Sequence, residues 1–151
     1  PSLLLDRDGT LCERHHYLTV PDQVQLLAGV GLELNRAISQ GINLFIITNQ
    51  SAIGRGLMSE SQLAAVHEEL ASQLGGYGVE VTAIVACPHA PWTGCECRKP
   101  NIGLFRQLES SHGVEPAMSV MVGDSPGDLE AAKRWGCDFV AVKLLFRGGP
   151  D

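Results

Sequence analysis

The sequence predicts an α/β fold of the Rossmann-like type, in which helices flank both faces of a parallel sheet. Short apolar runs alternate along the 151 residues with segments whose apolar residues recur every three to four positions, the spacing of a helix face. Strands that alternate with helices pair in parallel through right-handed crossovers. Polar residues follow several of the apolar runs, at the sheet edge where ligands bind in such folds. We expect a single domain over residues 1–151.

Composition and charge argue against several classes of protein. With 44% hydrophobic and 19% charged residues, the chain has a globular composition, and no apolar run reaches the roughly 18 residues of a membrane span. The net charge of -6, with no basic cluster beyond Arg98 and Lys99, disfavours binding along a nucleic-acid backbone. No secretory leader is visible. We expect a cytoplasmic monomer without nucleic-acid or membrane partners, whose small anionic substrate is held by local cations.

The first predicted strand, Leu3 to Leu5, ends at two acids. Three consecutive apolar residues fit a strand buried on both faces, and Asp6 and Asp8 follow at its carboxyl end. Alternation along the strand points both carboxylates to the same side, where they repel each other unless a cation or a shared proton lies between them. The sequence therefore predicts a divalent metal ion at this position.

The next elements extend the sheet and cover its edge. The polar stretch from Leu11 to Gly29 is predicted to form a flap over the end of the first strand. The helical spacing of apolar residues from Val30 to Ile38 predicts a helix that Gly41 ends. The apolar, β-branched run from Ile42 to Thr48 predicts a second strand, and the polar residues that follow it are Asn49, Gln50 and Ser51.

The second half of the chain continues the alternation. A capping box of Ser59 and Gln62 predicts the start of a helix, and Gly75 and Gly76 predict its end. The remaining predicted elements are a strand from Val79 to Ala86, a helix from Leu104 that stops at Gly113, a strand from Ser119 to Val122, a helix that Gly136 ends, and a strand from Phe139 to Val142. Lys99 and Asp124 lie beyond the third and fourth strands.

Three of the five cysteines are grouped with a histidine. Cys87, Cys95 and Cys97 lie within eleven positions, with His89 among them. This grouping is typical of a metal site rather than of a disulfide framework, and three thiolates with one imidazole form a closed tetrahedral set for zinc. We therefore expect the zinc to be structural and to shape the loop that leads to Lys99.

The other cysteines and two histidines have simpler interpretations. Cys12 and Cys137 are predicted to be buried small apolar residues, and Cys12 lies close enough to the acidic pair to face the site. His67 and His112 occupy helical positions and are predicted to be surface residues.

The residues at the strand ends fit the transfer of a phosphoryl group. A carboxylate such as Asp6 is a competent nucleophile toward phosphorus, and Mg²⁺ needs only one or two protein carboxylates beside carbonyl, water and phosphate oxygens. Lys99, the Thr48 hydroxyl and a metal ion can stabilise the charge on the transferred group. Asp8, two residues after the nucleophile, can protonate the leaving oxygen and later accept a proton from water.

Taken in order, these motifs resemble the haloacid dehalogenase superfamily of phosphatases. They are Asp-x-Asp-Gly-Thr starting at Asp6, a threonine at Thr48, a lysine at Lys99 before a helix, and Gly-Asp-x-x-x-Asp from Gly123 to Asp128, and they cover nearly the whole chain. The Cys-x-His-x5-Cys-x-Cys spacing further resembles the zinc-loop subgroup of the superfamily. The resemblance implies a haloacid dehalogenase fold with a minimal cap and a zinc-binding loop, with Mg²⁺ and structural Zn²⁺ as cofactors.

The resemblance also implies a role for each matching residue. Asp6 would be the nucleophile and a magnesium ligand, Asp8 the general acid and base that also offers its backbone carbonyl to the metal, and Asp124 the third magnesium ligand. Thr48 and Lys99 would stabilise the phosphoryl group. The implied zinc ligands are Cys87, His89, Cys95 and Cys97. The implied substrate-binding residues are Arg14, His15, His16, Tyr17, Asn49, Gln50, Ser51 and Arg98, with Arg98 recognising the far end of the substrate.

Asp128 and Ser125 are two further positions near the predicted site. Asp128 is expected to orient Lys99 or a metal-bound water rather than to bind the metal directly. Ser125 stands where the family often has a lysine after the metal-binding aspartate, so this chain departs from the family pattern there.

Residue patterns beside the second strand bear on the substrate. The run from Asn49 to Gly56 and the His-Tyr pair of the flap resemble the heptose bisphosphate phosphatases of the subgroup, which implies heptose precursor synthesis for lipopolysaccharide or surface glycans. Histidinol phosphatases tend instead to carry an acid where Ser51 stands. We expect a phosphorylated sugar as substrate, with histidinol phosphate or another small sugar or polyol phosphate as the alternatives.

Two classes other than phosphatases were weighed. A phospho-accepting receiver domain also places aspartates, a threonine and a lysine on a parallel sheet, but its accepting aspartate follows a middle strand and no zinc loop intervenes. A zinc-dependent interaction module would tolerate Asp6→Asn without loss of function. The acidic net charge and the four motifs at strand ends favour the phosphatase.

Overall fold

A computed structural model describes residues 1–142 and contains one parallel five-stranded sheet. The strands lie in the order β3-β2-β1-β4-β5, and every neighbouring pair is parallel. They are β1 (Ser2–Leu5), β2 (Asn43–Asn49), β3 (Ala83–Cys87), β4 (Ser119–Gly123) and β5 (Asp138–Ala141). The strand that carries the acidic pair therefore lies at the centre of the sheet, as its all-apolar sequence predicts.

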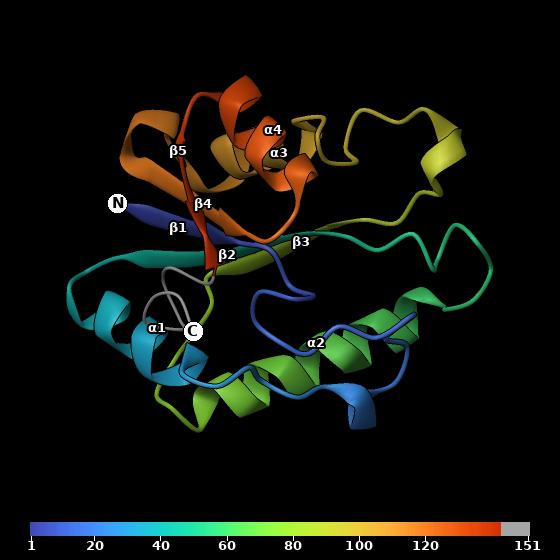
Figure 1. The fold of residues 1–151 in the computed structure, drawn as a ribbon, viewed down its shortest axis with the longest axis horizontal. Helices are drawn as coiled ribbons and strands as arrows, with labels where there is room; N and C mark the ends of the chain where they lie inside the picture. The colour runs from blue at the N-terminus through green and yellow to red at the C-terminus, as the bar shows by residue number, and fades with distance from the viewer. Residues whose placement is uncertain (143–151) are drawn as a thin grey trace.

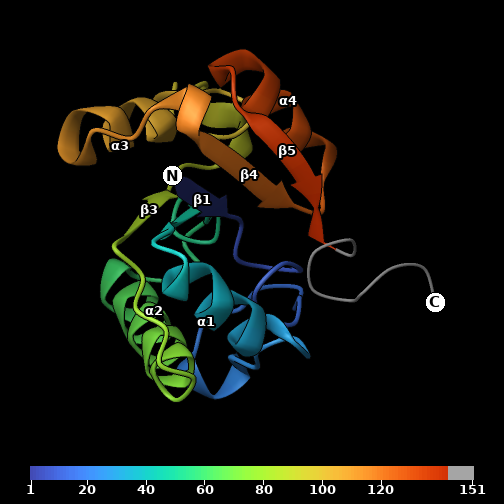
Figure 2. The same ribbon diagram turned by 90° about the vertical axis from the view of Figure 1, so that its left-hand side faces the viewer.

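Four helices cover the two faces of the sheet. They are α1 (Val30–Ser39), α2 (Glu60–Gly75), α3 (Gly103–His112) and α4 (Pro126–Trp135). Figures 1 and 2 show α1 and α2 on one face and α3 and α4 on the other, with the sheet between the two layers. Three short 3₁₀ turns complete the secondary structure of the described residues: η1 (Pro21–Gln23), η2 (Pro91–Thr93) and η3 (Pro116–Met118). The predicted fold class is confirmed.

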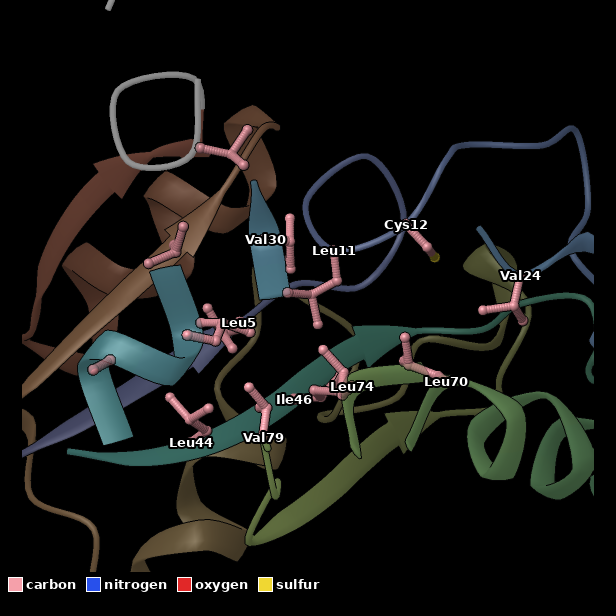
Figure 3. Packing of buried hydrophobic residues seen from close by; sticks show 14 of the residues in the cluster. Leu5, Leu11, Cys12, Val24, Val30, Leu44, Ile46, Leu70, Leu74 and Val79 are labelled. Carbon is pink, nitrogen blue, oxygen red and sulfur yellow. The ribbon is translucent and has the colours of Figure 1, made fainter. Parts of the chain in front are cut away.

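Two apolar cores lie on opposite sides of β1. Leu5 belongs to the core against α1 and α2, whereas its neighbour Leu4 belongs to the core against α3 and α4. Figure 3 shows the first of these cores, in which Leu5 and Ile46 of the sheet meet Leu74 of α2. Leu4 and Leu5 are both fully buried, so this strand cannot shift without disturbing both cores. The end of β1 is therefore a rigid base for the residues that follow it.

Most helix ends match the signals in the sequence, whereas one strand starts later than predicted. The Ser59 hydroxyl accepts a hydrogen bond from the Gln62 amide, and α2 ends at Gly75, as the capping box and the glycines indicate. The third strand was predicted from Val79 but pairs with β2 only from Ala83. Val79 is buried in the core beside α1 and α2, so the chain crosses the end of the sheet before it joins β2.

The predicted flap is anchored along α2 over much of its length. Leu18 and Val24 are buried in the core, and the Gln73 side chain of α2 donates a hydrogen bond of 2.9 Å to the Val24 carbonyl. In Figure 1 this segment runs beside α2, away from the sheet. Only its beginning, near Arg14, reaches the strand ends. No helix within residues 1–142 is long and apolar enough to cross a membrane.

Candidate active site

The carboxyl ends of β1, β2 and β4 surround a cavity of about 240 Å³. Asp6 leaves β1 at its base, where its backbone amide donates to the Val122 carbonyl of β4 at 3.0 Å. The residues that line the cavity are Asp6, Asp8, Arg14, Thr48, Asn49, Ser51, Arg98, Lys99, Ser125, Gly127 and Asp128. Side chains from five separate stretches of sequence therefore meet at one edge of the sheet, as the topology requires.

A buried lysine holds two carboxylates at the base of the cavity. The Lys99 ammonium donates to Asp6 Oδ1 at 3.0 Å, to Asp128 Oδ1 at 2.8 Å and to the Ile47 carbonyl at 2.7 Å, so all three of its donors are used. Burial opposes the charge on Lys99, but the Asp6 and Asp128 carboxylates outweigh it and raise the pKa of Lys99. The ammonium is therefore charged wherever the two acids are ionised.

Burial has the opposite consequence for Asp6, because it disfavours the charged carboxylate. It raises the pKa of Asp6 to about 6, with Asp128 adding to the rise and Lys99 opposing it. A carboxylate that is desolvated and yet ionised above this pH is a stronger nucleophile than one exposed to water. Asp6 thus has the environment expected of a group that attacks phosphorus.

The Asp8 carboxylate is turned away from this lysine and held by other groups. Arg7 Nε donates to Asp8 Oδ1 and Arg7 Nη2 to Asp8 Oδ2, each at 3.0 Å. The Gln50 amide donates to Asp8 Oδ2 at 3.1 Å and to the Thr48 hydroxyl at 2.9 Å. Gln50 is buried and does not line the cavity, so it differs from the substrate-binding residue expected from the sequence. Its place is behind Asp8 and Thr48, where it supports both.

The remaining acids surround a position suited to a cation. Carboxylate oxygens of Asp6, Asp124 and Asp128 lie within 4.8 Å of one another. Arg14 Nη2 donates to Asp124 Oδ2 at 2.7 Å and to the Asp8 backbone carbonyl at 3.1 Å. One cationic nitrogen thus bridges two oxygens that the resemblance assigns to Mg²⁺. The donor set is all oxygen and includes two or three carboxylates, so it fits that ion.

Asp128 is fully engaged by the protein. Its Oδ2 accepts from the Ser125 hydroxyl at 2.9 Å and from the Asp124 amide at 3.2 Å, while its Oδ1 accepts from Lys99. Ser125 caps α4 in return, since its hydroxyl accepts from the Asp128 amide. The contact expected between Asp128 and Lys99 is therefore present, and Ser125 serves the start of α4 rather than reaching across the cavity as a lysine could.

Two residues beyond the strand ends connect the cavity to the neighbouring loop. Asn49 donates from Nδ2 to the Lys99 carbonyl at 3.1 Å and accepts from the Lys99 amide at 2.9 Å. This reciprocal pair fixes the backbone of Lys99 against the end of β2. Arg98 lines the same region, and its Nη1 is a buried donor without a partner among the described residues. A buried donor of this kind favours an anionic group of a ligand as its partner.

The cysteines and the histidine of the predicted zinc loop converge. Their ligand atoms lie within 4.8 Å of one another, with Cys87 Sγ and His89 Nδ1 at 3.1 Å from Cys97 Sγ, and Cys95 Sγ at 3.6 Å from Cys87 Sγ. The set of three sulfurs and one nitrogen fits Zn²⁺ in a closed site. The backbone of this loop also contacts Gly54, where an added Cβ would lie 2.4 Å from the Ala90 nitrogen.

Several predicted residues lie apart from the cavity, and two that matter were missed. His15 and His16 are exposed, and neither they nor Tyr17 line the cavity. Arg7 was not singled out by the sequence analysis, although an arginine between two acids is a candidate partner for either. His67 was expected to lie on the surface, but it is half-buried and its Nε2 lies 3.1 Å from Arg7 Nη1. Cys12 is buried with its Sγ 3.8 Å from Asp8 Oδ1, as predicted.

The fold and this arrangement of groups define a hydrolase of the haloacid dehalogenase class. The family model described as HAD-hydrolase-like matches residues 96–144, which include Lys99, Asp124 and Asp128. Lys99, Asp124 and the start of α4 thus lie in the segment that this family shares.

Comparison with known proteins identifies the family of phosphatases within this class. The chain is 40% identical to D-glycero-beta-D-manno-heptose-1,7-bisphosphate 7-phosphatase from Haemophilus ducreyi, over 98% of this chain and 84% of that protein. It is 39% identical to the protein of the same name from Pseudomonas aeruginosa, over 93% and 80%. The crystal structure of D,D-heptose 1,7-bisphosphate phosphatase from B. bronchiseptica, complexed with magnesium and phosphate, superposes with a TM-score of 0.88 at 32% identity, covering 98% and 86%. The chain belongs to this family of phosphatases.

Proposed function

We propose that the protein removes the 7-phosphate of D-glycero-D-manno-heptose 1,7-bisphosphate through a phosphoryl group carried on Asp6. The observation that carries this proposal is the cavity itself, in which a desolvated Asp6 carboxylate lies 3.0 Å from the buried Lys99 ammonium. The family relatives with 39–40% identity carry the corresponding name.

In the first step, Asp6 attacks the phosphorus atom and the sugar oxygen leaves. The Lys99 ammonium and the Thr48 hydroxyl line the cavity and are available to stabilise the charge on the phosphoryl oxygens. Mg²⁺ held by Asp6, Asp124 and the Asp8 carbonyl would neutralise charge on the transferred group. Asp8 protonates the leaving sugar oxygen, which is too basic to depart readily as an alkoxide.

In the second step, water attacks the phosphorus and the bond to Asp6 breaks. Asp8 accepts the proton of this water, which reverses its role in the first step. Asp6 leaves as a carboxylate and inorganic phosphate is released. Asp8 lines the cavity, which supports this role.

The second phosphate of the substrate would be bound by Arg98. Arg98 lines the cavity together with Ser51 and Asn49, and its buried Nη1 has no hydrogen-bond partner within residues 1–142. A phosphate oxygen would satisfy this donor with a charge-assisted hydrogen bond. Arg98→Ala should therefore raise KM for a bisphosphate by about 10- to 100-fold, and leave turnover of a monophosphate nearly unchanged. An equal loss on both substrates would contradict this role.

The decisive experiment compares substrates. Magnesium-dependent phosphate release is measured on both anomers of heptose 1,7-bisphosphate and on histidinol phosphate, with Asp6→Asn as the blank. We expect kcat/KM to be higher by several orders of magnitude on the bisphosphate. A preference for histidinol phosphate would overturn the substrate assignment, and activity in the blank would overturn Asp6 as the nucleophile.

The proposal extends to the setting of the reaction. The product would serve heptose precursor synthesis for lipopolysaccharide or surface glycans, and the chain would act in the cytoplasm as a monomer built from one domain. Sedimentation of the active protein at assay concentration would test the monomer, and a dimer as the smallest active species would contradict it.

A further inference from the structure

The side chain of Arg7 is unusual because it is charged and fully buried. Only 1% of Arg7 is exposed. A buried guanidinium is unfavourable unless its charge is paired and its donors are satisfied. Two of its nitrogens meet the two oxygens of Asp8, each at 3.0 Å, in a bidentate pair. Its third nitrogen, Nη1, lies 3.1 Å from Nε2 of His67 on α2.

The chemical state of His67 follows from this contact. Burial, and next the charge of Arg7, lower the pKa of His67 to about 4. The ring is therefore neutral at physiological pH, with the proton on Nδ1, because Nε2 must accept the hydrogen bond from Arg7. The helix thereby supplies an acceptor for the one guanidinium nitrogen that Asp8 does not engage.

We propose that Arg7 and His67 are positioning residues that hold the Asp8 carboxylate in place for proton transfer, with His67 keeping the Arg7 guanidinium aligned. This inference rests on the proposed function, in which Asp8 is the general acid and base. Without the acceptor on His67, Arg7 Nη1 becomes an unsatisfied buried donor. This cost favours rotation of the guanidinium away from its bidentate geometry with Asp8. Asp8 would then be held only by the Gln50 amide and the weak donor of the Cys12 thiol.

The nucleophile does not depend on this pair. The side-chain bonds of Asp6, Lys99 and Asp128 reach neither the Arg7 side chain nor His67, and the one contact of Asp6 with Arg7 is through the Arg7 backbone amide, which substitution of His67 leaves in place. Loss of His67 should therefore impair steps that need a proton from or to Asp8 and spare the attack by Asp6. An aryl phosphate separates the two, because a nitrophenolate leaves with its electron pair and needs no proton, whereas hydrolysis of the phosphorylated Asp6 still requires Asp8 as base.

The experiment compares His67→Leu, which removes the acceptor, with His67→Gln, which retains one. Gln73→Ala is the matched control, because it removes a different hydrogen bond made by a half-buried residue of α2. On heptose 1,7-bisphosphate we expect His67→Leu to lower kcat by about 10- to 100-fold with KM within about twofold, and His67→Gln and Gln73→Ala to stay within about threefold of the unchanged protein.

Rapid mixing with 4-nitrophenyl phosphate supplies the readout that a structural role would not produce. For His67→Leu we expect a burst of one nitrophenolate per enzyme, at the rate of the unchanged protein, followed by slow turnover. Asp8→Asn should show the same pattern in a stronger form. A burst amplitude that falls in His67→Leu by the same factor as kcat would overturn the inference, because it would show that the variant is partly unfolded. An unchanged kcat in His67→Leu would also overturn it.

The same experiment separates this inference from the proposed function. If Asp8→Asn gives a burst and His67→Leu does not, the positioning role is wrong and the aspartyl phosphate stands. If neither gives a burst although both lose kcat on the sugar bisphosphate, the intermediate on Asp6 is wrong and the positioning inference falls with it.

Discussion

Two clusters of potential metal ligands lie near the same sheet edge, and they are stabilised in different ways. In the carboxylate cluster, side-chain cations of the protein already contact the acids: Lys99 contacts Asp6 and Asp128, and Arg14 contacts Asp124. In the cysteine and histidine cluster, the ligand atoms contact one another, and no Lys or Arg side chain of residues 1–142 bonds to them. The first cluster carries its own counter-charge, whereas the second has none.

This difference indicates which ion the fold depends on. Thiolates brought together without a cation repel one another, so the zinc loop should be ordered by its metal. The carboxylates are paired before any metal binds, so Mg²⁺ should be needed for catalysis and hardly at all for folding.

Removing the internal cation should make the carboxylate cluster resemble the zinc cluster. Lys99→Met leaves Asp6 and Asp128 buried without their shared partner, which should lower the free energy of unfolding by about 3–5 kcal/mol and abolish activity. Urea denaturation measures the loss, and Lys133→Met, at an exposed position of α4, is the control. Mg²⁺ should restabilise Lys99→Met more than the unchanged protein. Equal stabilisation of the two would show that Lys99 is not the counter-charge.

Removing a zinc ligand should destabilise the protein while leaving its nucleophile intact. We expect Cys97→Ser to lower Tm by on the order of 10 °C and to expose the loop from Ala90 to Glu96 to proteolysis. Calorimetry and limited proteolysis measure both effects, with Cys137→Ser as the control. Omitting Mg²⁺ should shift Tm by far less. A larger shift on omitting Mg²⁺ than in Cys97→Ser would reverse the comparison.

We expect the smallest of these effects from His67, the neutral partner of Arg7. It should appear as a dependence of the free energy of unfolding on pH. The pKa of His67 falls from 6.5 to about 4 on folding, so the unfolded chain binds more protons between these values. Above pH 6.5 His67 is neutral in both states and does not lower the free energy of unfolding. As pH falls from 6.5 toward 4, the unfolded chain takes up a proton that the folded chain does not, and the free energy of unfolding decreases. Between pH 7 and pH 5 this proton uptake should cost about 1–2 kcal/mol, measured by urea denaturation.

His67→Gln should lack this component of the acid destabilisation, because an amide does not titrate, and the exposed His112→Gln should retain it. Parallel pH profiles for the unchanged protein and His67→Gln would mean that folding does not lower the pKa of His67, which would contradict its buried contact with Arg7.

The position of the site could be predicted from sequence because it follows from topology. Carboxyl ends of parallel strands share one edge, so motifs after separate apolar runs must meet there, and Asp6, Thr48 and Lys99 do line one cavity. The convergence of the zinc-loop residues could likewise be predicted, since residue type and spacing are diagnostic. Relatives confirm the predicted fold class and phosphatase family.

Side-chain direction beyond the strand ends could not be predicted. Gln50 turns inward to Asp8, although a polar residue after a strand was expected to face the substrate. His67 has no periodic signal that separates an acceptor for a buried arginine from an ordinary residue of a helix surface. The contacts of Gln50 and His67 both depend on the position of the Arg7 side chain in the folded protein. The spacing of residues in the sequence does not give that position.

The reciprocal hydrogen bonds between Asn49 and Lys99 bear on how such a protein can diversify. They fasten one end of the zinc loop to β2, while Cys87 fastens the other end within β3. The tip between these anchors, residues 91–94, is exposed. Insertions or deletions at the tip would leave Lys99 where it is, so the length of this loop can drift or be engineered without moving the groups that line the cavity.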